Sequence, residues 1–219
     1  AMTGVFVQAS DSATTFVATD GHRLIRYRRE DVKSPNNTSM ILPRKALNLL
    51  KSSLPGEILP VKAEFSSSNA FFSFGNIKMI CRLIDERFPD YENVIPQNNP
   101  NKLKIERTEL LSTLKRISIY SNKTTHQIRL KISANELVIS AEDLDYSNEA
   151  TEKLACEYDG EEIEIGFNAK FLIEMLNNLS VKNISLEMSQ PNRAGLIIPV
   201  EKTDKEDTLM LVMPVMLNT

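Results

Sequence analysis

The side chains that come closest to a catalytic set are those of Asp20, His22 and Arg23, which follow an apolar, strand-like run at residues 14–17. An Asp-Gly step after such a run predicts a tight turn at Gly21, because glycine tolerates positive φ. A carboxylate, an imidazole and a guanidinium beside this turn suit either proton transfer or the holding of a peptide. Hydrolysis by Asp20 and His22 also needs a nucleophilic serine or cysteine, and none stands out.

Other arrangements give no stronger sign of an enzyme. The second histidine, His126, is about a hundred residues away, and the sequence has no GxSxG, HExxH, P-loop or GxGxxG pattern. Glu142, Asp143 and Asp145 lack the glycine and distal glutamate of a calcium loop, which favours a solvated acidic loop. We therefore predict no catalytic residue, no metal site and no cofactor.

Apolar residues fill the carboxyl end, from Leu209 to Leu217. One interpretation is a buried edge strand that stops at Pro214. The other is a soft surface for partner side chains, because methionine adapts to varied shapes and an uncovered tail would fray. Residues 87–96 form a proline-bracketed loop in which Phe88 and Tyr91 either pack internally or serve a partner.

Basic side chains gather on three predicted helices. No acidic residue lies between positions 43 and 56, and six lysines and arginines fall on these helices: Arg44, Lys45, Lys51, Lys115, Arg116 and Lys170. They form either an ordinary solvated surface or a row of contacts to phosphates.

The composition is that of a globular protein of one large domain or two domains of about 100–125 residues. The 219 residues are 42% hydrophobic, with a net charge of −3, which argues against tight DNA binding by charge alone. Cys81 and Cys156 are expected to be buried, reduced thiols. No run reaches the ~18 apolar residues of a membrane span, and no secretory pattern is seen. The chain begins directly in a predicted strand, as expected for a piece of a longer protein.

Apolar periodicity predicts three helices, at residues 43–54, 108–120 and 168–179. Pro43 suits a first-turn position, and Thr108 and Asn168 suit N-caps. Apolar stripes are predicted at Leu47, Leu50 and Leu54 in the first helix, at Leu110, Leu114 and Ile117 in the second, and at Phe171, Met175 and Leu179 in the third. Strands are predicted at 4–8, 14–18, 70–74, 78–84, 128–132, 137–141, 163–165, 184–188, 196–200 and 209–213.

A weak internal repeat has an offset of 125 residues, which relates 42–50 to 167–175 and, nearly, 4–18 to 128–141. Helix 108–120 has no counterpart near the start of the chain. We therefore expect a domain that lacks its first strand and helix at residues 1–98, and a complete domain at 99–219. The polar linker at 96–101 separates them.

Five blocks occur in an order and spacing that resemble the bacterial sliding clamp family, the DNA polymerase III beta subunit. They are Thr19-Asp20-Gly21-His22-Arg23-Leu24, Pro43-Arg44-Lys45, Arg87-Phe88-Pro89-Asp90-Tyr91, Gly166-Phe167-Asn168-Ala169-Lys170 and Val212-Met213-Pro214-Val215. The resemblance runs from about Met2 to Leu217. It implies an α+β fold of DNA clamp domains, with antiparallel sheets on the outer face and helices on the inner face. It covers most of the second and all of the third clamp domain.

The function that this resemblance implies is that of a non-enzymatic processivity factor in the bacterial cytoplasm, associated with the nucleoid. A head-to-tail homodimer ring encircles duplex DNA without regard to sequence, and tethers the replicative polymerase. The implied partners are the DNA polymerase III alpha subunit, the clamp loader, and other polymerases and repair proteins, which bind through short linear motifs. Without the first domain, we expect no closed ring.

The resemblance also implies two sets of site residues. A peptide cleft between the second and third domains would include Met2, Thr19, Gly21, His22, Arg23, Leu24, Pro89, Asn93, Val94, Ala194, Leu211, Val212, Met213, Pro214, Val215, Met216 and Leu217. The DNA-facing residues would be Arg44 and Lys45 by family similarity, and Lys51, Lys115, Arg116 and Lys170 by position on the helices. Asn93 and Met216 stand where the family often has arginine, and Asn218 and Thr219 extend past the usual end.

Two rival hypotheses remain beside the clamp. A small hydrolase would use Asp20 and His22. A structural duplication without a DNA role would show no preference for clamp-binding peptides.

Overall fold

The chain forms two compact units in a computed structural model, which describes residues 1–54 and 60–217. Unit 1 comprises Ala1–Asp20, Ile25–Tyr91 and Lys205–Asp207, and unit 2 comprises Gly21–Leu24, Glu92–Asp204 and Thr208–Thr219. The Asp-Gly turn thus divides between the units, and His22 and Arg23 are described with unit 2.

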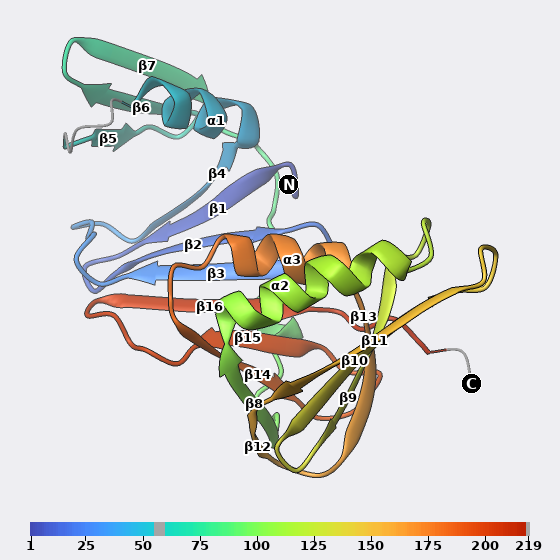
Figure 1. Cartoon of the computed structure of the whole chain (residues 1–219). Helices are drawn as coiled ribbons and strands as arrows, with labels where there is room; N and C mark the ends of the chain where they lie inside the picture. The colour runs from blue at the N-terminus through green and yellow to red at the C-terminus, as the bar shows by residue number, and fades with distance from the viewer. Residues whose placement is uncertain (55–59, 218–219) are drawn as a thin grey trace. The chain divides into compact units, whose positions relative to one another are not determined.

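The described residues of unit 1 form two antiparallel sheets and one helix (Figure 1). Strands β3, β2, β1 and β4 lie in that order, and a three-stranded sheet follows the order β5, β6, β7. Their bounds are β1 Gly4–Ala9, β2 Thr14–Thr19, β3 Arg23–Arg29, β4 Thr38–Pro43, β5 Lys62–Phe65, β6 Asn69–Phe74 and β7 Ile77–Arg82. The buried core joins β1, β4 and β6 through Val7, Met40, Leu42, Ala70 and Phe72.

Helix α1, Arg44–Ser53, lies over this core and packs Leu47 and Leu50 against it. Pro43 is the residue before the helix, with φ −67° and ψ 138°, so its predicted first-turn position is wrong by one residue. Proline has no side-chain acceptor, and the first amide of the helix, that of Arg44, instead donates to the carbonyl of Thr3 at 3.2 Å. Leu54 follows the helix and is 37% exposed, so it is not part of the apolar stripe.

Unit 2 contains two antiparallel sheets and two helices (Figure 1). One sheet has the order β12, β8, β14, β15, β16, and the other has the order β11, β10, β9, β13. Their bounds are β8 Asn101–Glu106, β9 Gln127–Ser133, β10 Glu136–Asp143, β11 Asn148–Ala155, β12 Glu157–Asp159, β13 Ile163–Asn168, β14 Asn183–Met188, β15 Gly195–Pro199 and β16 Glu206–Val212. Residues of β16 from Thr208 onward belong to unit 2.

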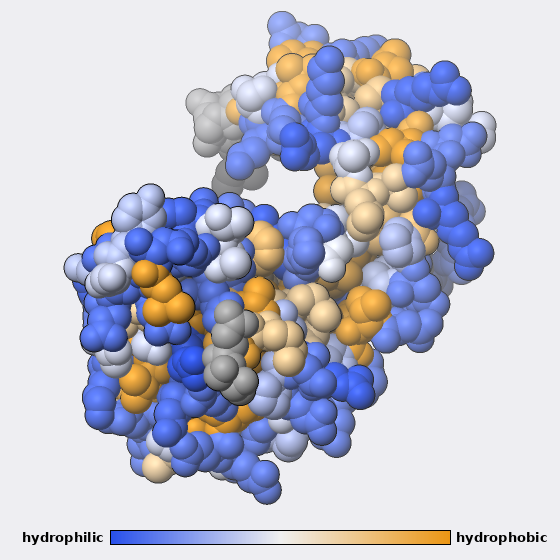
Figure 2. Space-filling model, turned by 90° about the vertical axis from the view of Figure 1, so that its right-hand side faces the viewer, coloured by the Kyte–Doolittle hydropathy of each residue, from blue (hydrophilic) through white to orange (hydrophobic). Residues whose placement is uncertain are grey.

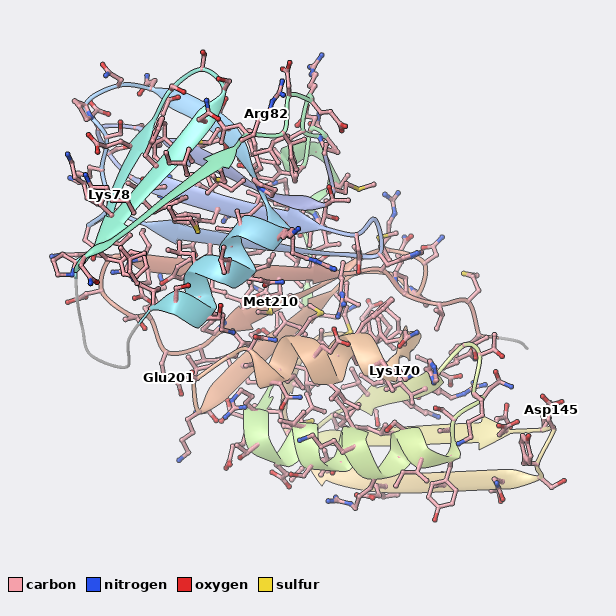
Figure 3. All side chains as sticks on the ribbon, turned by 90° about the horizontal axis from the view of Figure 1, so that it is seen from above. Lys78, Arg82, Asp145, Lys170, Glu201 and Met210 are labelled. Carbon is pink, nitrogen blue, oxygen red and sulfur yellow. The ribbon has the colours of Figure 1, made fainter. Side chains whose placement is uncertain are left out.

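Helices α2, Arg107–Ile117, and α3, Ala169–Asn177, lie side by side and antiparallel (Figures 1 and 3). Arg107, at the start of α2, donates to the carbonyl of Leu176 at the end of α3 at 3.1 Å, and to that of Val181 at 2.9 Å. Leu110, Leu114 and Ile117 are buried as predicted, and so are Met175 of α3 and Leu179, which lies two residues beyond the end of that helix. Short 3₁₀ turns η1, Glu92–Val94, and η2, Ser118–Tyr120, complete the unit.

The structure confirms one of the two N-caps predicted for these helices and contradicts the other. Asn168 is the N-cap of α3, and its side chain accepts hydrogen bonds from the amides of Lys170 and Phe171, which confirms the prediction. Thr108 lies inside α2, and Glu106 is the N-cap residue there, so that prediction is wrong. The Thr108 hydroxyl donates to the Glu106 carboxylate.

The repeat with an offset of 125 residues is visible in the element bounds. Helix α1 begins at Arg44 and α3 at Ala169, and β4, Thr38–Pro43, recurs as β13, Ile163–Asn168, each 125 residues later. The strand order β3, β2, β1, β4 of unit 1 also matches β11, β10, β9, β13 of unit 2. Within residues 1–54 and 60–91, the pair β8 and α2 has no counterpart.

All ten predicted strands overlap strands of the structure. Within residues 1–54 and 60–217, six strands were not predicted: β3, β4, β5, β8, β11 and β12. Most of these have mixed or charged sequences, such as Asn148–Ala155 in β11, at the edge of its sheet. Strands that expose much of their surface need little apolar alternation, so periodicity misses them.

Candidate functional site

The Asp20-Gly21 step forms the predicted turn between β2 and β3. Gly21 has φ +88°, and no atom lies within 4 Å of the position that a Cβ would occupy. Backbone conformation, rather than lack of space, is therefore why glycine is needed there. After the turn, the backbone of His22 and the side chain of Arg23 make contacts with other residues of unit 2.

The carboxyl-terminal segment, residues 213–217, is held by two backbone hydrogen bonds. The Met213 amide donates to the carbonyl oxygen of His22 at 2.8 Å, and the Val215 amide donates to that of Gly166 at 2.9 Å. Gly166 allows this close approach, because an added Cβ would lie 2.5 Å from the Val215 carbonyl oxygen and 2.8 Å from the Leu217 side chain. The segment is thus a docked strand-like tail along β13.

Both interpretations of the carboxyl end describe part of it. In β16, Leu209, Met210, Leu211 and Val212 are buried, which agrees with the burial expected in the first interpretation. The next residues differ, because Met213 is 42% exposed and Met216 is 72% exposed. Figure 2 looks onto the face that bears the carboxyl end, where apolar surface alternates with hydrophilic surface. Exposed methionines on a fixed backbone suit contact with a partner.

Phe171 of α3 is the centre of a small cluster with His22 and Arg23. The His22 ring stacks on it with a centroid distance of 5.9 Å, and the Arg23 guanidinium carbon lies 4.7 Å from the ring centroid. Glu174, one turn along α3, forms an ion pair with Arg23 at 2.7 Å. Sequence periodicity placed Phe171 in a core stripe and missed this role. Phe171 is only half-buried, and it supports the two polar residues of the turn.

Asn168 positions this cluster. Its side-chain oxygen accepts from the Lys170 and Phe171 amides at 3.0 and 3.4 Å, and its amide nitrogen donates to the Thr125 carbonyl at 3.0 Å. These bonds give two backbone amides in the first turn of α3 an acceptor, and they fix the position of Phe171 at the start of the helix.

The remaining residues of the predicted peptide site fall into three groups. Val94 of η1 is 56% exposed, and Asn93 precedes it. Leu24, Ala194, Leu211 and Val212 are buried and do not themselves offer exposed contact surface. Met2, Thr19 and Pro89 belong to unit 1. Asn218 and Thr219 lie outside the described residues.

The two aromatic rings of the loop at residues 87–96, Phe88 and Tyr91, pack inside unit 1. Phe88 stacks on Phe6 at 4.8 Å, and the Tyr91 hydroxyl donates to the Gln8 side chain at 2.8 Å. Both rings are buried, which favours the internal-packing interpretation.

All six basic residues predicted to face DNA are exposed: Arg44, Lys45 and Lys51 on α1, Lys115 and Arg116 on α2, and Lys170 on α3. Figure 3 labels Lys170. Arg116 differs from the others, because both of its hydrogen bonds to Glu152, at 2.8 and 2.6 Å, compensate its charge. The same pairing lowers the pKa of Glu152 and raises that of Arg116.

His126 lies where β9 begins, close to the start of α3. Its carbonyl accepts from the Ala169 amide at 2.8 Å, the same arrangement as that of Thr3 with Arg44 in unit 1. Partial burial, and then the charges of Lys170 and Lys123, lower the pKa of His126. The charges of both lysines therefore oppose protonation of the His126 imidazole.

Among residues 1–54 and 60–217, no group of three His, Cys, Asp or Glu side chains is placed to hold a metal ion. Asp143 is buried, contrary to the expectation of a fully solvated loop, and it accepts from the Asp145 amide at 3.2 Å. Cys81 and Cys156 are free and half-buried, rather than buried, and burial raises the pKa of both thiols. The longest helix in this part of the chain has 11 residues, too few to cross a membrane.

Comparison with known proteins gives two family matches that together span almost all of the chain. Residues 1–90 match the central domain of the DNA polymerase III beta subunit, and residues 92–215 match its C-terminal domain. The predicted boundary between residues 98 and 99 stays a prediction.

Curated relatives named beta sliding clamp include those of Vibrio cholerae and Escherichia coli K12. Each is 31% identical over 216 residues, which are 99% of this chain and 58% of the relative. The chain therefore spans a little over half the length of these relatives.

Solved structures of sliding clamps have the same fold. The clamp of Pseudomonas aeruginosa bound to griselimycin has a TM-score of 0.91 and 28% identity, over 98% of this chain and 57% of its own. That of Borrelia burgdorferi, in complex with a natural product, has a TM-score of 0.91 and 26% identity, over 99% and 57%. These matches confirm the α+β clamp fold, and with the two domain matches they show that the chain belongs to the DNA polymerase III beta subunit family.

Proposed function

We propose that this chain is the part of a DNA sliding clamp that binds partner peptides. The family match supports the clamp role, and the site in unit 2 supports peptide binding. The single observation that carries the peptide site is the hydrogen bond from the Met213 amide to the His22 carbonyl. It joins two motifs about 190 residues apart in sequence.

The proposed peptide surface combines a rigid backbone with adaptable side chains. Met213 and Met216 offer apolar contact to leucine or phenylalanine. Phe171 holds Arg23 and also His22, whose carbonyl accepts from the Met213 amide. Apolar anchors with a polar rim are the usual means by which a groove or surface holds a short motif. The residues of unit 1 that the family resemblance adds, Met2, Thr19 and Pro89, remain part of the proposal.

The proposed contact with DNA is weak and independent of sequence. Lysine and arginine tips on α1, α2 and α3 would touch phosphates, which suits a chain of net charge −3 that holds DNA by encirclement. Arg116 would contribute least, because Glu152 already neutralises it.

The proposed partners are duplex DNA, the DNA polymerase III alpha subunit, the clamp loader, and other polymerases and repair proteins with short linear motifs. The setting is the bacterial cytoplasm at the nucleoid, and we propose no catalytic activity. In the full-length protein a head-to-tail homodimer would close the ring. We do not expect the 219-residue polypeptide alone to do so, and sedimentation that shows a stable ring-type dimer would overturn this expectation.

Fluorescence titration with a labelled Gln-x-x-Leu-Phe peptide tests the peptide site. Saturable binding by the wild-type chain, weakened about tenfold or more in Met213→Ala, would support it. Leu144→Ala is a matched control, because Leu144 is 83% exposed on the β10–β11 loop and outside the site. Leu24 is buried, so Leu24→Asp would test folding instead of binding. No binding at hundreds of micromolar peptide would contradict the proposal.

A further inference from the structure

The ion pair between Arg23 and Glu174 has no role in the function proposed above. Glu174 follows Phe171 by three residues, so both side chains lie on one face of α3. Phe171 covers one side of the Arg23 guanidinium, and Glu174 contacts its edge at 2.7 Å. The positive charge of the turn is therefore balanced by a carboxylate on the supporting helix.

Both side chains of this ion pair are accessible to solvent. The Glu174 side chain is 61% exposed and that of Arg23 is 26% exposed, so a bound ligand can approach both. A ligand carboxylate that approaches the guanidinium must also approach Glu174, and like charges at such distances repel. A neutral acceptor, such as an amide oxygen, meets the same guanidinium without that repulsion.

We propose that Glu174 determines the charge specificity of this site, and makes it favour peptides with a neutral residue beside Arg23 over acidic ones. The inference rests on the proposed peptide-binding function. Loss of the carboxylate would remove from Arg23 the opposing charge that position 174 supplies. Glu174→Gln keeps the shape of the side chain and removes only its charge.

The test uses acetyl-Gln-Gln-Gln-Leu-Phe-amide and the three peptides in which one glutamine is replaced by glutamate. In the wild-type chain each glutamate peptide is expected to bind no better than the parent. In Glu174→Gln, at least one glutamate peptide is expected to gain about three- to tenfold relative to the parent, and the gain should shrink at high salt. The parent peptide should keep its affinity within about threefold.

Two further variants isolate the effect. Glu164→Gln removes the same charge from another ion pair of unit 2, with Arg129, and should leave the glutamate-to-glutamine ratios unchanged. Arg23→Gln combined with Glu174→Gln should abolish the gain, because the cation that attracts the glutamate is gone. Thermal unfolding of each variant checks that the fold is intact.

The outcomes separate the two proposals. If the parent peptide binds and the ratios at all three positions are the same in wild type and Glu174→Gln, the charge-specificity role is wrong and the peptide site stands. If the parent peptide does not bind the wild-type chain at all, the peptide site fails, and the role of Glu174 fails with it.

Discussion

Gly166 and Val215 form an isolated antiparallel bridge, in which the Val215 amide donates to the Gly166 carbonyl at 2.9 Å. A Cβ on residue 166 would lie 2.5 Å from the Val215 carbonyl oxygen. The clash would be with a backbone atom, which no side-chain rotation can move, so the tail could avoid it only by moving away from β13. Gly166 is therefore the residue that lets the carboxyl-terminal segment lie against β13.

Gly166→Ala is expected to destabilise unit 2 by about 1–3 kcal/mol, as overpacking does, and to weaken peptide binding through the displaced Met213 and Met216. Chemical denaturation and the peptide titration measure the two effects. Gly195→Ala is the control, because its added Cβ would meet the far edge of the Phe167 ring at 3.2 Å and not the tail. Equal losses in both variants would contradict the special role of Gly166.

Phe171→Leu is expected to weaken peptide binding about two- to fivefold, because leucine keeps apolar volume but cannot hold Arg23 by a cation–π contact or stack on His22. Phe171→Tyr keeps the ring and should bind as the wild type does. The peptide titration compares the two, and unchanged affinity in Phe171→Leu would show that the ring is not needed.

Asn168→Ala should cost about 1 kcal/mol of stability, since two amides of the first turn of α3 lose their acceptor. Asn168→Asp keeps an acceptor and should retain most of the stability. Thermal unfolding of the two variants checks this, and a loss of similar size in both would show that the bond from Asn168 to Thr125 matters more than the cap.

His126 should make the protein less stable as the pH falls. Its folded-state pKa is lowered, so the unfolded chain binds the proton more readily, and stability declines as the pH drops below about 6.5 toward the folded pKa. Urea denaturation between pH 7.5 and 5 should show this decline. His126→Gln should make stability decline less steeply between pH 7.5 and 5. An unchanged pH profile in this variant would show that His126 does not cause the decline.

Binding to DNA at low salt should weaken when Lys45 and Lys51 are replaced by glutamine. Each lost phosphate contact should lower the slope of log K against log salt by about 0.9. Fluorescence anisotropy with a labelled duplex measures the slope. Lys78→Gln on β7 removes a charge from a strand outside the helices and is the control (Figure 3). Equal slopes in all variants would argue against a DNA contact through α1.

The sequence alone determined the locations of the three α-helices in the described part of the chain, of ten strands, and of the repeat, and it identified the family. Local signals were enough for these features, because helix periodicity, the Asp-Gly turn and the Asn168 cap each depend on neighbouring residues. It failed at Thr108, which was predicted as an N-cap but lies inside α2, and at Pro43, which was predicted in the first turn but occupies the N-cap position of α1. Boundaries of this kind depend on where the preceding strand ends.

Only the tertiary structure decided which residues of the site meet. The apolar spacing of Phe171 predicts a core residue, and nothing in that spacing shows that its ring lies against Arg23. The pairing of Met213 with His22, and of Val215 with Gly166, joins segments far apart in the chain through backbone groups, which every residue carries and no side-chain pattern marks. The charge balance of Arg23 by Glu174 has the same origin, since an ion pair depends on distance in space and not on separation in sequence.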